Sequence, residues 1–341
     1  VLQNADEGTR KTINQFLNYP ENSAGSLMTI EYVDLHDYFT VRKAMDYIRR
    51  TGIDKETVYT CYVIDDQRRL VGQVSLRKLI IAPESACIRD IMDTNIVSAA
   101  TTDDQEAVAD DFRRYDLTSI AVCDKEGRLV GIITIDDIVD VIQDENTEDI
   151  KKMAAIIPSD EDYMKTSVWS LVAHRLPWLM LLMISATFTS TIITHFETLL
   201  SGAVLLTAFI PMLMDSAGNS GSQTSVTVIR NLALGEIELR DWPHVLAKEI
   251  GVAVVSGAAL ALVNFLRIII FTSTSMMIAA VVSVTLFCTV IIAMIVGCLL
   301  PIGAKKLGFD PAVMASPMIT TIVDACSLMI YFLIATSMLG L

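Results

Sequence analysis

The second half of this sequence has few charged residues. Residues 171–341 contain 7 of the 26 lysines and arginines and 8 of the 40 aspartates and glutamates, within long apolar runs. Residues 1–170 contain the other 19 and 32, so their net charge is 19 − 32 = −13. This division predicts an acidic soluble part followed by a polytopic membrane part. The acidic charge argues against nucleic acid and anionic membrane surfaces as partners.

Several common motifs are absent as well. The sequence has no P-loop and no clustered nucleophile and histidine, which argues against an enzyme. None of the six cysteines forms a CxxC pair, so we expect buried or free thiols in a reducing compartment. The acidic stretches lack EF-hand spacing, which argues against tight calcium binding.

An internal repeat occupies residues 24–142, and the tetrapeptide RLVG recurs at 69–72 and 128–131. Each copy contains a helical stretch and short β-branched runs with turn residues between them, which predicts the order β-α-β-turn-β-α. Thr40 and Asp104 precede the helical stretches, where their side-chain oxygens can cap the first turn.

The repeat resembles a tandem pair of CBS domains, a regulatory module that often binds adenine nucleotides. In that family a Gly, a Thr or Ser and an Asp at fixed spacing mark the nucleotide site. The second copy matches with Gly131, Thr134 and Asp137, whereas the first copy has Lys78 where the Asp belongs. The resemblance implies at most one nucleotide site, for example for ATP. A folded pair without nucleotide is an equally open interpretation.

An acidic helix is predicted after the second copy, because residues 136–149 combine seven carboxylates with apolar and amide residues. Like charges four residues apart destabilise a helix by a few tenths of a kcal/mol each, and we expect Lys151 and Lys152 to offset little of this. A solvated acidic face is one interpretation, and weak binding of hydrated Mg²⁺ is another. Pro158 interrupts the helical pattern in the linker that follows. If the linker forms a continuous helix, it would transmit motion from the acidic domain to the first span.

Five membrane spans are expected in the apolar half. Arg230, Arg240, Lys248, Lys305 and Lys306 all fall in loops on the side of the soluble domain. The positive-inside rule therefore predicts a cytoplasmic soluble domain, and five spans leave the C-terminus outside. The predicted spans are residues 176–193, 199–228, 250–271, 276–303 and 312–339.

The second predicted span contains the polar stretch PMLMDSAGNSGSQ, residues 211–223. We expect it to interrupt the helix, because irregular backbone at membrane depth lines cavities and builds ion sites. The alternative is a glycine-mediated contact between helices. In the fifth span, Asp324 is the one charged residue among residues 311–341. A carboxylate near the membrane midplane usually faces a bundle interior or an aqueous path, although a protonated, structural Asp is the alternative.

These motifs give a specific resemblance. Pro211, Gly218, Asn219, Gly221 and Gln223 form the pattern P-x6-G-N-x-G-x-Q, which is similar to the signature of the MgtE family of magnesium channels or transporters. The order of the parts is also similar, and the resemblance covers nearly all of the chain. It implies an α/β CBS-domain pair followed by an all-α polytopic membrane domain with five transmembrane helices, assembled as a homodimer.

The resemblance also implies domain boundaries. Residues 1–23 are expected to be the end of an N-terminal helical domain. The predicted domains after it are CBS domain 1 (24–85), CBS domain 2 (86–146), a connecting helix and linker (147–175) and the pore domain (176–341).

The residue roles follow from the same resemblance. Asp324 is expected to hold hydrated Mg²⁺ in the pore, with Asn219, Gly218, Gly221, Gln223 and Ser316 around it. The expected regulatory metal ligands are Asp137, Asp140, Glu145, Glu148, Asp149, Asp310, Glu106 and Asp116.

The resemblance implies a protein of the plasma (inner) membrane that takes up Mg²⁺. Binding of cytosolic Mg²⁺ is expected to close its pathway. A Na⁺- or H⁺-coupled divalent cation transporter and a membrane-anchored nucleotide sensor are the alternatives.

Overall fold

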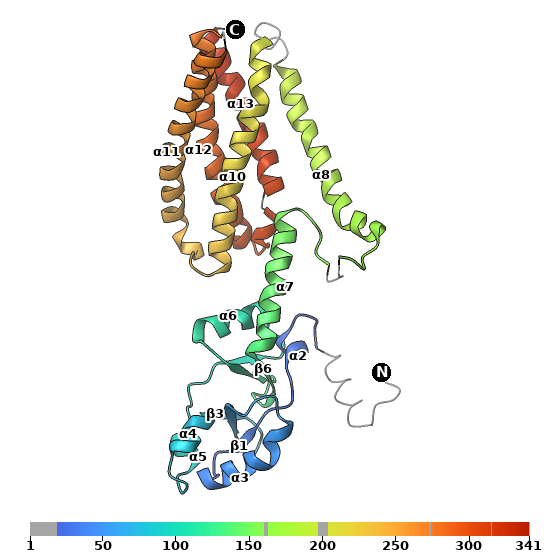
Figure 1. The fold of residues 1–341 in the computed structure, drawn as a ribbon, viewed down its shortest axis with the longest axis vertical. Helices are drawn as coiled ribbons and strands as arrows, with labels where there is room; N and C mark the ends of the chain where they lie inside the picture. The colour runs from blue at the N-terminus through green and yellow to red at the C-terminus, as the bar shows by residue number, and fades with distance from the viewer. Residues whose placement is uncertain (1–18, 160–162, 197–203, 273, 315, 341) are drawn as a thin grey trace. The chain divides into compact units, whose positions relative to one another are not determined.

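The structure is a computed structural model, and it describes residues 19–159, 163–196, 204–272, 274–314 and 316–340 (Figure 1). The expected remnant of an N-terminal helical domain lies mostly outside the described residues. The chain divides into two compact units, Val1–Asn146 and Thr147–Leu341. Each unit is considered by itself below.

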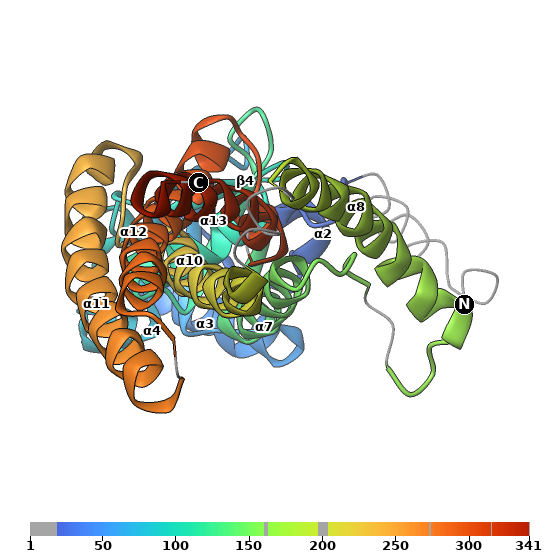
Figure 2. The same cartoon turned by 90° about the horizontal axis from the view of Figure 1, so that it is seen from above.

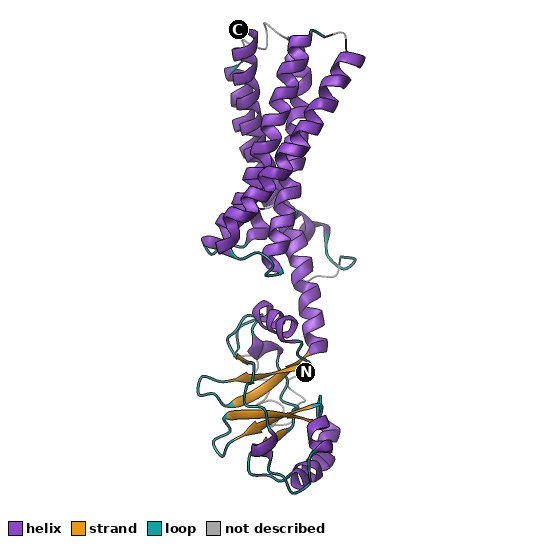
Figure 3. Cartoon of the chain, turned by 90° about the vertical axis from the view of Figure 1, so that its left-hand side faces the viewer, coloured by secondary structure: helices purple, strands orange, loops and turns teal. Residues whose placement is uncertain are grey.

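The first unit contains two repeats of the same order of elements, as the sequence predicts. In each repeat, the first strand is parallel to the second and the second is antiparallel to the third, which gives two three-stranded sheets (Figure 3). The first repeat consists of α2 (Ala24–Leu27), β1 (Asp34–His36), α3 (Val41–Thr51), η2 (Gly52–Asp54), β2 (Thr60–Ile64), β3 (Leu70–Ser75) and α4 (Leu76–Ile81). The second consists of α5 (Ile88–Ile91), β4 (Ser98–Ala100), α6 (Gln105–Tyr115), β5 (Ser119–Cys123), β6 (Leu129–Thr134) and the first part of α7 (Ile135–Met153), whose residues from Thr147 belong to the second unit.

The opening residues of each repeat pair with the sheet of the other repeat. The backbone N–H groups of Thr29 and Ile132 each donate to the other residue's carbonyl oxygen, at 2.7 and 2.9 Å. Gln73 and Asp93 do the same at 2.9 and 2.8 Å. The two repeats therefore interlock, which the order of elements along the sequence does not reveal.

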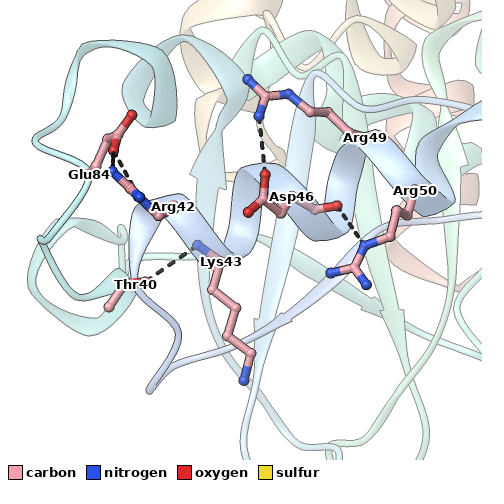
Figure 4. Close-up of polar contacts among 7 residues, drawn as sticks. All are labelled: Thr40, Arg42, Lys43, Asp46, Arg49, Arg50 and Glu84. Carbon is pink, nitrogen blue, oxygen red and sulfur yellow. Dashed lines mark hydrogen bonds and ion pairs between the residues drawn. The ribbon is translucent and has the colours of Figure 1, made fainter.

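The polar and charged side chains on and around helix α3 form hydrogen bonds and ion pairs within the first unit (Figure 4). The side chain of Thr40 accepts a hydrogen bond from the backbone N–H of Lys43 at 3.3 Å, so the predicted N-cap is confirmed, as is Asp104 on α6. Arg49 pairs with Asp46 at 3.1 Å, and Arg42 pairs with Glu84. The basic groups of these pairs serve intramolecular contacts.

The second unit is a helical bundle built around α12 (Met276–Lys306). Helix α12 packs against α10 (Ile210–Ala233), α11 (Trp242–Phe271) and α13 (Ser316–Leu339), and α8 (Val168–His195) packs against α13 (Figure 2). Three short 3₁₀ segments lie between the helices: η3 (Val204–Phe209), η4 (Leu239–Asp241) and η5 (Pro311–Met314).

Four of the described helical segments are long and apolar enough to cross a bilayer: Val168–His195, Leu239–Phe271, Met276–Lys306 and Pro311–Leu339. They correspond to the first, third, fourth and fifth predicted spans. Helix α10 corresponds to the second, and its 24 residues extend roughly 36 Å at 1.5 Å per residue. Its polar residues lower its hydropathy, so the count of five spans stays a prediction.

The expected interruption of the second span is wrong. Helix α10 is continuous from Ile210 to Ala233 and includes all of GNSGSQ. Pro211 lies in the first turn, where its missing N–H costs no hydrogen bond. The glycines are accommodated because neighbouring helices pack directly against them, which is the alternative that the sequence left open.

The connection between α7 and α8 is not a continuous helix. Helix α7 ends at Met153, and Ala155 has a left-handed φ of 54° before Pro158 is reached. Helix α8 begins only at Val168. Any motion of α7 therefore has to reach the bundle through side-chain contacts as well as through the chain.

Candidate ion pathway

A polar stripe runs along one side of α10. Asp215, Asn219 and Gln223 are spaced four residues apart and therefore share a face of the helix, and all three are exposed in the single chain. Thr227 continues the stripe, and its hydroxyl donates to the carbonyl oxygen of Gln223 at 2.8 Å. The predicted pore residues Asn219 and Gln223 thus lie together, and Asp215 joins them.

The glycines of the motif lie on the other side of α10. A Cβ atom on Gly221 would lie 2.9 Å from Ile319 of α13 and 3.0 Å from the carbonyl oxygen of Ala293 of α12. A Cβ on Gly218 would lie 3.2 Å from Thr320. In this structure Gly218 and Gly221 let three helices approach closely, so they position the polar stripe by packing.

Asp324 lies half-buried on α13, next to the buried Val323. Helices α10 and α13 pack against each other, and Asp215 on α10 and Asp324 on α13 carry like charges that act on each other electrostatically. Over the part of the chain that is described, the ion pairs found do not include a basic partner for Asp324. Two like charges on neighbouring helices repel each other, and a bound cation relieves that repulsion.

Asp215 was not among the residues singled out from the sequence. The signal that could have found it is its place four residues before Asn219, in an otherwise apolar part of the helix. Ser316 begins α13, but its side chain lies outside what the structure describes.

A second group of carboxylates surrounds Lys152 at the end of α7. The Lys152 ammonium donates to Asp310 Oδ2 at 2.7 Å and lies 2.5 Å from Glu148 Oε1. Asp310 Oδ1 also accepts the backbone N–H of Ala312 at 2.8 Å, so this carboxylate caps η5. Burial lowers the pKa of Lys152, but hydrogen bonds and charges of Asp310 and Glu148 outweigh that effect and raise its pKa above the ordinary value. Lys152 is therefore firmly protonated.

The other predicted regulatory acids lie along α7, on α6 or at the end of α6. Glu145 accepts a hydrogen bond from Gln105 at 2.8 Å, and Asp116 ends α6 in a left-handed conformation with φ of 51°. Asp140 and Glu106 are exposed, whereas Asp149 is half-buried. Among the described residues, no group of three or more His, Cys, Asp or Glu side chains is arranged to hold a metal ion.

The nucleotide motif of the second repeat is only partly available. Gly131 is buried, and a Cβ there would lie 2.6 Å from the sulfur of Met28, so this glycine serves packing. The Thr134 hydroxyl donates to Asp137 Oδ2 at 3.0 Å. In the first repeat, Ser75 caps α4 by accepting the N–H of Lys78 at 3.3 Å. The second repeat alone thus pairs a hydroxyl with a carboxylate at this place.

Comparison with known proteins identifies the family of this chain. The MgtE family, described as divalent cation transporters, matches residues 210–334, and the CBS domain matches residues 24–85 and 88–144. The magnesium transporter MgtE of Thermus thermophilus is 37% identical over 98% of this chain and 74% of its own length. The chain belongs to the MgtE family.

Further relatives agree. The magnesium transporter MgtE of Bacillus subtilis is 35% identical to this MgtE-family chain, over 98% of the chain and 74% of that protein. A crystal structure of the cytosolic domain of the Mg²⁺ channel MgtE in complex with ATP is 43% identical, over 40% of this chain and 55% of that one, with a TM-score of 0.39. Membership in this transporter family confirms the predicted fold class, a CBS pair followed by apolar membrane helices. It also confirms that the protein is not an enzyme.

Proposed function

We propose that this MgtE-family protein conducts Mg²⁺ across a membrane along the polar stripe of α10 and Asp324 of α13. The observation that carries the proposal is a pair of like charges, Asp215 on α10 and Asp324 on α13, on two helices that pack together, with no basic partner for Asp324 in the described residues. A cation from outside the chain would neutralise this pair. The named relatives are magnesium transporters, which makes Mg²⁺ the expected cargo.

The side chains of the stripe suit a hydrated ion. Mg²⁺ gives up its water shell reluctantly and is bound by few carboxylates through retained waters. The amide groups of Asn219 and Gln223 can accept hydrogen bonds from those waters and donate hydrogen bonds to them. The inward-negative membrane potential contributes about 2.3 kcal/mol per charge per 100 mV, so passive entry needs no ATP hydrolysis.

The working assembly is proposed to be a homodimer with its pathway between two copies. In the single chain Asp215, Asn219 and Gln223 are exposed, and polar groups of this kind face a bundle interior or water rather than lipid. A second copy placed against α10 and α13 would enclose the stripe. The basic loops favour a CBS pair in the cytoplasm and, together with five proposed spans, a C-terminus outside the plasma membrane.

Closure by cytosolic Mg²⁺ is the proposed regulation. The acids of α7 and its surroundings repel one another when two copies approach, and divalent cations would reduce that repulsion. A ligand shifts such an equilibrium only through its different affinity for the two states. The acids assigned to this role are Asp137, Asp140, Glu145, Glu148, Asp149, Asp310, Glu106 and Asp116.

An adenine nucleotide is a further proposed ligand of the CBS pair. The hydroxyl and carboxylate of Thr134 and Asp137 lie together, and such a pair can contact ribose and phosphate groups. Titration of the protein with ATP, followed by calorimetry, tests this part of the proposal.

Flux into proteoliposomes tests the transport proposal. We expect Mg²⁺ uptake by the intact chain, lost in Asp324→Ala, and reduced as Mg²⁺ on the CBS side rises through the millimolar range. A current that reverses at the Mg²⁺ equilibrium potential supports conduction, whereas a reversal potential that moves with Na⁺ or H⁺ supports coupled transport. No flux from a folded, dimeric chain would favour the membrane-anchored sensor.

A further inference from the structure

The end of α7 is held to Asp310, just before η5, by a cation that belongs to the chain. The Lys152 ammonium lies 2.7 Å from Asp310 and 2.5 Å from Glu148, and the three side chains are between 24% and 36% exposed. Sequence reasoning assigned Glu148 and Asp310 to a regulatory divalent ion. In this structure the space between these two carboxylates is filled by an ammonium group.

Several neighbouring contacts fix the same segment. Met153 packs against Ile229 of α10 and Ala312 of η5. The backbone N–H of Ile157 donates to the carbonyl oxygen of His174 on α8 at 3.0 Å. The end of α7 and the residues after it therefore contact three parts of the bundle, and Lys152 supplies the charged contact among them.

Asp310 links this contact to the proposed pathway. Its second oxygen accepts the N–H of Ala312 and so orders η5, which comes before α13 in the sequence. The Lys152–Asp310 contact therefore holds the segment that precedes α13 in the chain, the helix that carries Asp324.

We propose that Lys152 is a built-in cation that docks α7 on the bundle without a divalent ion, and that a divalent ion reaches Glu148 and Asp310 only by displacing Lys152. An ammonium donates three hydrogen bonds and satisfies two carboxylates at once. A Mg²⁺ bound between the same oxygens would occupy the same space, and two cations so close repel each other. The part about regulation rests on the proposed function, whereas the docking does not.

A chemical labelling experiment measures the docking directly. In the full chain, Met153→Cys places a thiol at the contact with Ile229 and Ala312, and its rate of reaction with a maleimide reports undocking. Peptide mass spectrometry separates this thiol from the native cysteines. The test variant is Lys152→Met, with Lys152→Gln as a second variant should the first fail to fold. Lys152→Arg keeps the charge.

The matched control is Lys151→Met. Lys151 has the same side chain one residue away, but its ammonium donates to the backbone carbonyl of Ser159 at 2.6 Å. Lys151→Met therefore removes a neighbouring lysine and leaves the contacts of Lys152 with Glu148 and Asp310 in place.

With divalent ions removed by EDTA, we expect labelling to accelerate about fivefold in Lys152→Met, the size of a partly exposed charge network. Labelling in Lys152→Arg and Lys151→Met should match the parent. Addition of 10 mM Mg²⁺, about the level at which weak sites fill, should slow labelling of Lys152→Met to the parent rate, because the freed carboxylates can then bind the ion.

Unchanged labelling of Lys152→Met in EDTA would overturn the proposal, because the bridge would then contribute nothing to docking. Acceleration that Mg²⁺ does not reverse would overturn the shared site. Neither readout depends on transport, so a chain that moves no Mg²⁺ would refute the proposed function and leave the docking result standing.

Discussion

Asp310 and Asp324 carry the same side chain in neighbouring segments, but their partners differ. Asp310 accepts hydrogen bonds from Lys152 and from the backbone of Ala312. Asp324 lies near a second carboxylate, Asp215, and the ion pairs of the described chain leave it without a basic partner. A carboxylate that has an internal cation is already neutralised, whereas one that faces another carboxylate favours a cation from outside. The two acids therefore suit different tasks, docking at one place and ion passage at the other.

The same substitution at both positions tests this difference. Asp324→Asn removes the charge that attracts the ion, and we expect Mg²⁺ flux to fall about 100-fold, as for loss of roughly 3 kcal/mol. Asp310→Asn keeps an oxygen for the Ala312 N–H but weakens the bond to Lys152, so flux under closing conditions should rise about fivefold.

Initial Mg²⁺ uptake into proteoliposomes, at low and high Mg²⁺ on the CBS side, measures both variants. Cys326→Ser, two residues from Asp324 on α13, serves as the control for substitution in this helix. Equal losses of flux in the two Asn variants would contradict the division of tasks.

Close packing against α12 positions the helix that carries Asp215, and one glycine tests it. A Cβ atom on Gly297 would clash with the carbonyl oxygen of Gly221, whereas nothing lies within 4 Å of a Cβ on Gly303 of the same helix. We expect Gly297→Ala to destabilise the protein by about 2 kcal/mol through overpacking. Gly303→Ala should lie within about 0.5 kcal/mol of the parent.

Thermal unfolding in detergent measures both glycine variants. If the two alanine variants unfold at the same temperature, the close approach of α10 and α12 is not a source of stability.

We expect Asp215 to attract the ion less strongly than Asp324 does, because Asp215 is exposed while Asp324 is half-buried. Solvent screens an exposed charge more strongly, so we expect Asp215→Asn to lower Mg²⁺ flux about tenfold, less than Asp324→Asn does. Asp215→Glu keeps the charge and should retain flux within about threefold of the parent. A tenfold loss in both variants would show that the shape of the side chain matters here, and not its charge.

The sequence predicted the parts of the fold that depend on local patterns. The β-branched runs and the RLVG repeats predicted two similar repeats, and Thr40 and Asp104 were identified as caps because capping depends on neighbouring backbone groups. The exchange of opening residues between repeats was not predictable in this way. It depends on backbone pairing between Thr29 and Ile132, which are far apart in the chain.

The wrong predictions for α10 and for Lys152 have a common physical cause. Glycine and proline in GNSGSQ and its flank weaken an isolated helix, but Pro211 lies in the first turn and Gly221 is covered by two helices. Tertiary packing therefore restores a continuous helix. Lys152 was likewise expected to matter little, because its partner Asp310 comes from a remote segment that no helical spacing could reveal.

Asp137 adds a third kind of carboxylate to the comparison, since its partner is a neutral hydroxyl. Thr134→Val removes that hydroxyl, and we expect the affinity for ATP to fall about fivefold, as for loss of one hydrogen bond of roughly 1 kcal/mol. Ser75→Ala is the matched control, because Ser75 occupies the same place in the first repeat but is followed by Lys78 in place of an acid. Calorimetric titration of both full-length variants with ATP gives the answer. An equal loss of affinity in Ser75→Ala would move the nucleotide away from the Thr134–Asp137 pair and remove the functional difference between the repeats.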